Sequence, residues 1–125
     1  MYTLSVKQDF VARHDPIERS QGPENGQHTH LYEVEVRMEG LGLDRQGYLV
    51  DIEEVHICLN ELIGVYSGKV LNDLPEFENR YPSLEQFARV LHTAIADRFK
   101  DQPLRSLAVR LRDTEHAWAG YSETY

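Results

Sequence analysis

Cysteine is nearly absent from this sequence of 125 residues. The single cysteine, Cys58, excludes an intrachain disulfide framework and is typical of a protein that works in a reducing cytosol. Long hydrophobic runs are also missing, because no apolar stretch approaches the ~20 residues that a membrane-spanning helix needs. Residues 1–6 contain no basic segment followed by an apolar one, so we expect no signal peptide. These absences predict a cytoplasmic protein without a membrane anchor.

Positive charge is scarce as well. The chain has 13 Lys and Arg against 21 Asp and Glu, a formal net charge of −8 at pH 7, and no block of basic residues stands out. A surface that binds nucleic acid or an anionic membrane needs clustered positive charge, so we expect neither partner. The hydrophobic content of 41% and charged content of 27% are those of an ordinary globular protein. The length predicts one domain, residues 1–125, with no internal repeat.

A strand-like pattern over residues 28–38 carries two histidines. Apolar and polar residues alternate with period two from Tyr32 onward, which predicts a β-strand. His28 and His30 share the parity of the apolar positions, so both are expected on the apolar face. Two histidines at i and i+2 on one strand face can hold a metal ion. The alternative is that the pattern is chance and one imidazole is a hydrogen-bonded core residue.

A third histidine lies in the preceding predicted strand, residues 1–14. Its apolar positions have even parity, and His14 continues that parity. Residues 15–27 are rich in Pro, Gly, Asn and charge, which predicts a loop. An antiparallel pair of strands around this loop would bring His14 beside His28 and His30. Three histidines on one face are typical of a catalytic zinc site, which uses three protein ligands and leaves one position open.

Two amphipathic helices are predicted in the middle of the chain. The first follows Asp51, a good N-cap with Glu54 as its capping-box partner. Its expected buried stripe is Ile52, Val55, Leu59, Leu62, Ile63 and Tyr66, with His56 and Cys58 beside the stripe in packing or surface roles. The second begins after Ser83, with Gln86 as its capping-box partner, and its stripe runs from Leu84 to Phe99. His92 lies off the centre of that stripe and is expected in solvent, while residues 67–81 read as an irregular loop.

Two further strands are predicted near the end of the sequence. Residues 107–112 alternate, and Asp113 continues the parity of the apolar set. A carboxylate on a core-facing position is costly unless a ligand with N–H donors, a buried Arg, or water at a strand end pairs with it. Residues 117–121 read as a short last strand, so the element order is ββααββ, an α+β fold.

At this point the chain resembles the family of 6-pyruvoyltetrahydropterin and 6-carboxytetrahydropterin synthases, over nearly its whole length. Residues 10–14 (Phe-Val-Ala-Arg-His) are similar to the family's Phe-x-Ala-x-His, and residues 28–32 (His-Thr-His-Leu-Tyr) to its His-Gly-His-x-Tyr. Residues 47–51 resemble Gly-x-x-x-Asp, and residues 82–85 (Pro-Ser-Leu-Glu) resemble Pro-Thr-x-Glu. Arg112, Asp113 and Thr114, with Tyr121, stand where the family has Glu-Thr and a closing Tyr. Each motif is weak alone, but five in order at suitable spacing are specific.

The resemblance implies a tunnelling fold, a four-stranded antiparallel sheet with two helices on one face. Family members close three such sheets into a barrel and stack two trimers into a homohexamer with sites between subunits. It also implies a lyase that binds zinc through three histidines, here His14, His28 and His30, and acts on 7,8-dihydroneopterin triphosphate or a related pterin. Asp113 takes the place of the carboxylate that holds the pterin, and the motif positions Ser83 and Glu85 are expected near the ring.

Two departures from the family pattern leave two functions open. Glu24 stands at the place of the family's catalytic Cys, as in a branch that carries Glu there and cleaves the side chain to give 6-hydroxymethyl-dihydropterin. Ser67 and Gly68 replace the Asp-His pair of the family's Leu-Asp-His-x-x-Leu-Asn, and neither can transfer a proton. The chain is therefore an active enzyme with Glu24 as general base, or a catalytically altered or inactive homologue that binds zinc and pterins. A zinc hydrolase acting on another substrate is a third, remote possibility.

Overall fold

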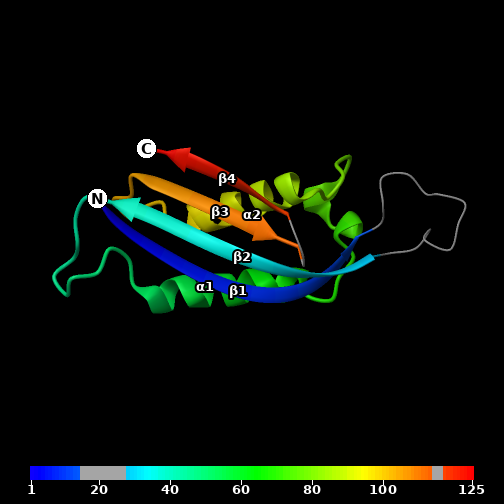
Figure 1. The fold of residues 1–125 in the computed structure, drawn as a ribbon, viewed down its shortest axis with the longest axis horizontal. Coiled ribbons are helices and arrows are strands. Elements are labelled where there is room, and N and C mark those ends of the chain that lie inside the picture. The colour runs from blue at the N-terminus through cyan, green and yellow to red at the C-terminus, as the bar shows by residue number, and fades with distance from the viewer. Residues whose placement is uncertain (15–27, 114–116) are drawn as a thin grey trace, which may run out of the picture.

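The computed structural model describes residues 1–14, 28–113 and 117–125 (Figure 1). The element order is ββααββ, as predicted. The strands are β1 (Tyr2–His14), β2 (His28–Gly40), β3 (Ser106–Arg112) and β4 (Trp118–Thr124), and the helices are α1 (Ile52–Tyr66) and α2 (Leu84–Arg98). The predicted loop 67–81 contains two short 3₁₀ turns, Leu71–Asp73 and Pro75–Phe77, which bury Leu71 and Phe77. Within these described ranges, no helix is long and apolar enough to cross a membrane.

The four strands form one antiparallel sheet in the order β1-β2-β3-β4. One row across the sheet joins Val6, Val36, Val109 and Tyr121. β1 and β2 pair along their full lengths, whereas β3 pairs with β2 only from Glu33 to Glu39. The first five residues of β2, 28–32, therefore have a sheet partner on one side only. β1 and β4 form the two edges of the sheet.

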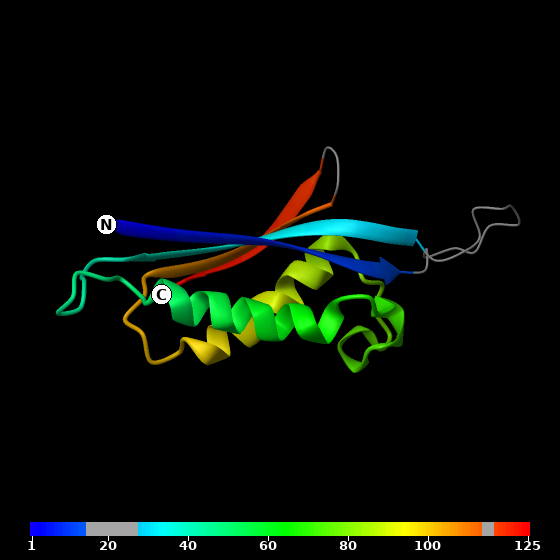
Figure 2. The ribbon, with the colours of Figure 1, turned by 90° about the horizontal axis from the view of Figure 1, so that it is seen from below.

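Both helices pack on the same face of the sheet, which we call the helix-covered face (Figure 2). Every second residue of β1, β2 and β3 points to this face, as the period-two pattern predicted, and most of these residues are buried. The buried sheet residues of this face are Val6, Phe10, Ala12, Tyr32, Val34, Val36, Met38, Leu107, Val109 and Leu111. The other side, the uncovered face, is not covered by any helix of the described chain.

The helix starts follow the predicted caps. The side chain of Asp51 accepts a hydrogen bond from the backbone N–H of Glu53 at 2.9 Å, and Ser83 accepts one from the N–H of Gln86 at 3.1 Å. Ile52 was expected in the buried stripe of α1, but its side chain is 46% exposed. It is the first residue of the helix, and the buried positions begin one turn later, at Val55.

The prediction that His92 is solvated is wrong. Its side chain is 1% exposed, Nε2 lies 3.1 Å from the carbonyl oxygen of Leu107, and its ring packs edge-on against Tyr121. The reason is that α2 lies over both β3 and β4, so its buried arc is wider than a single stripe. A histidine at the margin of that stripe then faces β3 instead of water.

Candidate functional site

Three predicted site residues meet in a small pocket at one end of the sheet. The pocket has a volume of about 140 Å³ and is lined by His30, Tyr32, Tyr81, Pro82, Ser83, Leu84 and Asp113. These residues come from β2, from the start of α2 and from the end of β3. The sequence predicted His30, Ser83 and Asp113 as site residues in three separate elements, and the fold brings them to one pocket.

The local structure explains why these side chains converge. His30 and Tyr32 are successive residues of the helix-covered face of β2, and their ring centroids are 5.8 Å apart. Asp113 directly follows β3, which pairs with β2 as far as Glu33 and Arg112. Ser83 caps α2 at the edge of this face, where the apolar packing ends. The pocket therefore lies where the core gives way to polar side chains.

Tyr32 gives the pocket a neutral hydrogen-bond donor. Its side chain is 3% exposed, and its pKa is raised well above the ordinary value, first by burial and then by the nearby charge of Asp113 and by Tyr81. Because the charged phenolate is disfavoured, the hydroxyl keeps its proton at any physiological pH. The pocket thus offers one neutral O–H group close to a carboxylate that can accept hydrogen bonds.

The three histidines proposed as metal ligands occupy adjoining positions of the β1–β2 ladder. His14 pairs with His28, and His30, two residues further along β2, pairs with Ala12. The side chains of His14 and His28 lie outside the described structure, as does the whole of Glu24. Among the side chains that are described, no group of three His, Cys, Asp or Glu gathers closely enough to hold a metal ion. The backbone register places positions 14, 28 and 30 next to one another at this end of the ladder.

The segment at Ser67 and Gly68 lies directly against the end of β1. The N–H of Gly68 donates to the carbonyl oxygen of Val11 at 2.8 Å, and the N–H of Arg13 donates to that of Lys69 at 3.0 Å. Gly68 has a φ of 72°, a conformation that glycine adopts at little cost. This segment therefore lies beside the end of β1, next to position 14. It supplies backbone hydrogen bonds there, but Ser67 and Gly68 offer no acid or base.

Two predicted pterin contacts differ in their placement. Ser83 lines the pocket, although its hydroxyl already serves as the cap of α2. Glu85 is exposed in the first turn of α2 and does not line the pocket. Conversely, Tyr32 and Tyr81 line the pocket and were not predicted as site residues. The parity of His30 and Tyr32 could have identified the first of these tyrosines, whereas nothing local marks Tyr81.

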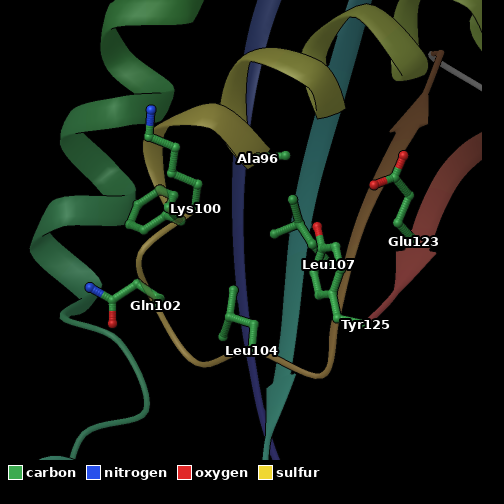
Figure 3. Close-up of a pocket in the computed structure, with 8 residues that line it drawn as sticks. Ala96, Lys100, Gln102, Leu104, Leu107, Glu123 and Tyr125 are labelled. Carbon is green, nitrogen blue, oxygen red and sulfur yellow. The ribbon is translucent and has the colours of Figure 1, made fainter.

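A larger hollow of about 410 Å³ lies at the other end of α2 (Figure 3). Leu104 and Leu107 form its middle, with Lys100 and Gln102 on one rim and Glu123 on the other. It contains none of the predicted site residues. The pocket at the start of α2 is accordingly the stronger candidate for chemistry.

The comparisons with known proteins identify the family of the chain. Residues 3–124 match the family described as 6-pyruvoyl tetrahydropterin synthase. The fold is similar to that of 6-pyruvoyl tetrahydropterin synthase from Plasmodium vivax, with a TM-score of 0.81 and 13% identity over 99% of this chain and 98% of that one. The corresponding proteins of Plasmodium falciparum (TM-score 0.78, 13% identity, 99% and 98% covered) and Caenorhabditis elegans (TM-score 0.79, 16% identity, 98% and 96% covered) are also similar. No curated protein matches the sequence.

These matches confirm the expected architecture, an α+β fold of ββααββ order that corresponds to the tunnelling fold. At identities of 13–16%, the solved structures speak for the fold alone. The family match, by contrast, covers almost the whole chain and includes the strands, the helix start and the strand end that build the pocket. The chain belongs to the 6-pyruvoyl tetrahydropterin synthase family, an enzyme family of pterin lyases.

Proposed function

We propose that this chain is a zinc-dependent lyase acting on 7,8-dihydroneopterin triphosphate or a related pterin. The observation that carries the proposal is the pocket in which a family member brings His30, Tyr32, Ser83 and Asp113 together.

Asp113 is the proposed anchor of the pterin ring. A pterin presents an amide N–H and an exocyclic amine side by side, which match the two oxygens of one carboxylate. Ser83 lines the same pocket, and the neutral hydroxyl of Tyr32 can donate to an acceptor of the ring. Glu85, exposed in the next turn of α2, remains a proposed pterin contact on the strength of its motif.

His14, His28 and His30 are the proposed zinc ligands. A zinc ion there would supply polarisation of the oxygens on the substrate's side chain. The chain's own part is to present three ligands from paired strand positions beside the pterin pocket.

Glu24 is the proposed general base. Two structures of the Plasmodium vivax protein carry substitutions of a glutamate that their descriptions name as a catalytic residue, which supports a glutamate in this role. A carboxylate can act as a base when a dry site raises its pKa toward neutrality. With Ser67 and Gly68 against β1, no second acid–base pair is proposed for that segment.

Assembly is part of the same proposal. The outer edges of β1 and β4, apart from the end of β1 that bonds to residues 68–70, suit pairing between subunits, so we expect a trimer-based homo-oligomer, a hexamer in its complete form. A cytoplasmic location is proposed from the single cysteine, which is buried as a free thiol. Light scattering at micromolar concentration tests the assembly, and a monomer would contradict it.

The decisive experiment is incubation with 7,8-dihydroneopterin triphosphate, with products identified by mass. Turnover is expected, and Glu24→Gln should abolish it, whereas Glu53→Gln, an exposed glutamate of α1, should not.

Metal analysis should find about one zinc per chain, which His28→Ala loses and His56→Ala, at an exposed histidine, retains. Full zinc retention in His28→Ala would contradict the ligand assignment.

The second candidate is a homologue that binds zinc and pterins without the standard reaction. The replacement of the family's Asp-His pair by Ser67 and Gly68 favours it. Neopterin binding without turnover would establish this candidate. Asp113→Ala should then lower the affinity for neopterin about tenfold or more, while leaving the zinc content unchanged. Asp101→Ala, an exposed position after α2, is the matched control, and equal affinities in both variants would remove Asp113 from the site.

A further inference from the structure

The uncovered face of the sheet gathers cations that are far apart in the sequence. A hollow of about 130 Å³ on this face is lined by Lys7 of β1, Arg37 of β2, and Arg110 and Arg112 of β3, together with Glu33 and Glu35. The strand register explains the gathering, because Lys7 pairs with Glu35 and Glu35 pairs with Arg110. Four cations thus surround two carboxylates in a chain whose net charge is −8.

Glu35, which lies between Lys7 and Arg110, leaves the N–H donors of the neighbouring arginines free to bind a ligand. Its side chain accepts a hydrogen bond from the hydroxyl of Ser5 at 2.5 Å. Its oxygens lie 3.9 Å from the nearest guanidinium nitrogen of Arg37 and 3.9 Å from that of Arg110, beyond ordinary hydrogen-bond length. The side chains of Arg37 and Arg110 are 52% and 37% exposed, so their N–H groups remain accessible to a ligand.

Arg110 is held in place by an aromatic ring. Its guanidinium carbon lies 3.6 Å from the centroid of Trp118, and a stacked guanidinium keeps its in-plane N–H donors free. A neighbouring hollow of about 280 Å³ runs along Trp118, Gly120 and Tyr121. A Cβ added at Gly120 would lie 2.9 Å from the carbonyl oxygen of Val109 and 3.7 Å from the Trp118 ring. Only glycine therefore leaves space at this position of the hollow.

We propose that the uncovered face is a second binding site, for a small phosphorylated molecule with a flat ring. The phosphate lies among Arg37, Arg110, Arg112 and Lys7, and the ring lies over Gly120 beside Trp118. Guanidinium groups bind phosphate oxygens through paired N–H donors, and an accessible aromatic side chain binds a flat ring. The site is separate from the pterin pocket, because the two lie on opposite faces of the sheet and share no lining residue.

The chain provides its own reporter for this site, since Trp118 is its single tryptophan. Titration with ADP at constant ionic strength should change the Trp118 emission in a saturable way, and adenosine should not. Inorganic pyrophosphate should compete with ADP. Arg37→Gln should weaken ADP binding about tenfold by isothermal titration calorimetry, which does not depend on the tryptophan.

Arg98→Gln is the matched control. Arg98 is a partly exposed arginine of α2 that pairs with Glu61 at 2.7 Å on the helical side, so this variant removes the same charge from the other layer of the molecule. It should bind ADP as the parent does. Equal weakening of ADP binding in both variants would mean that net charge alone explains the effect, and this would overturn the site. An absence of saturable ADP binding in the parent protein would also overturn it.

Two further variants separate this site from the proposed pterin function. Asp113→Ala and His30→Ala should keep their affinity for ADP, even if Asp113→Ala no longer binds pterin and His30→Ala no longer binds zinc. Loss of the ADP signal in Asp113→Ala, with an unchanged melting temperature, would place the nucleotide in the pterin pocket and overturn the second site. Failure of the pterin reaction alone would leave the ADP result intact.

Discussion

The two faces of this sheet are made by alternate residues of the same strands, yet they have opposite chemistry. On the helix-covered face the centre is apolar, and polar groups such as His30 and Asp113 occur at the end where the core stops. On the uncovered face the centre is charged, with Glu35 between Lys7 and Arg110. A covered face thus offers a site only at its margin, whereas an uncovered face can place one in the middle of the sheet.

The difference also separates stability from binding. Removing apolar area from the covered face takes away packing that the whole fold uses, because the core is one continuous cluster. Changing a charge on the uncovered face alters accessible ion pairs, which contribute little to stability. Substitutions on the two faces can test how far that separation holds.

The largest effect is expected from one substitution made on both faces. Leu111→Ala removes a fully buried side chain of β3 and should lower the free energy of unfolding by about 2–5 kcal/mol. Leu31→Ala, on the uncovered face of β2 with 47% exposure, should cost less than about 1 kcal/mol. Urea unfolding of both variants gives the comparison. Similar losses would mean that the uncovered face is packed against something in solution.

A smaller effect is expected at Gly120. Its added Cβ would meet the carbonyl oxygen of Val109 at 2.9 Å, so Gly120→Ala forces β3 and β4 apart and should cost about 1–3 kcal/mol. Thermal unfolding measures this loss, and Gly42→Ala, where nothing lies within 4 Å of the added atom, is the control. A neutral Gly120→Ala would show that the edge strand moves freely.

Ser83 tests the margin of the covered face. Its hydroxyl caps α2, so Ser83→Ala should destabilise the protein by about 1 kcal/mol, whereas Ser83→Asp should retain most of the stability. Pterin affinity measured on the same two variants then shows whether the hydroxyl has a role beyond the cap. Stability unchanged in Ser83→Ala would contradict the capping role.

The smallest effect concerns pH and the centre of the uncovered face. The hydrogen bond from Ser5, with the charges of Arg37, Lys7 and Arg110, lowers the pKa of Glu35 in spite of its burial. A lowered pKa stabilises the fold at pH values above the ordinary glutamate pKa of about 4.3, and this contribution is lost as the pH falls through the lower, folded value. Glu35→Gln should therefore flatten the decline of stability in that acid range. Parallel pH profiles for the two proteins would show that Glu35 contributes nothing.

Much of this architecture could be predicted because it depends on local patterns. Strand parity placed Val34, Val36 and Leu111 on the covered face, and the caps Asp51 and Ser83 fixed both helix starts. The pairing of positions 14 and 28 also followed from one hairpin. Such features need only the residues nearby in sequence.

What could not be predicted depends on how elements cross or pair. His92 is buried because α2 covers both β3 and β4, which no helical periodicity reveals. The sequence showed no basic block, yet Lys7, Arg37 and Arg110 meet because the register brings three strands together. The roles of Glu24, Glu85 and the three histidines remain predictions, because they rest on the resemblance to the family.

The one-sided pairing of residues 28–32 has a consequence for local opening. This end of β2 continues past β3 as a ribbon with β1, which residues 68–70 hold on its other side, so β2 itself has no sheet partner beyond β1 here. Its amides should exchange with deuterium before those of residues 33–39, which have partners on both sides. If zinc binds at positions 14, 28 and 30, it would close this ribbon from its free end. Slower exchange in the first residues of β2 would then be a direct signature of the metal, visible without any substrate.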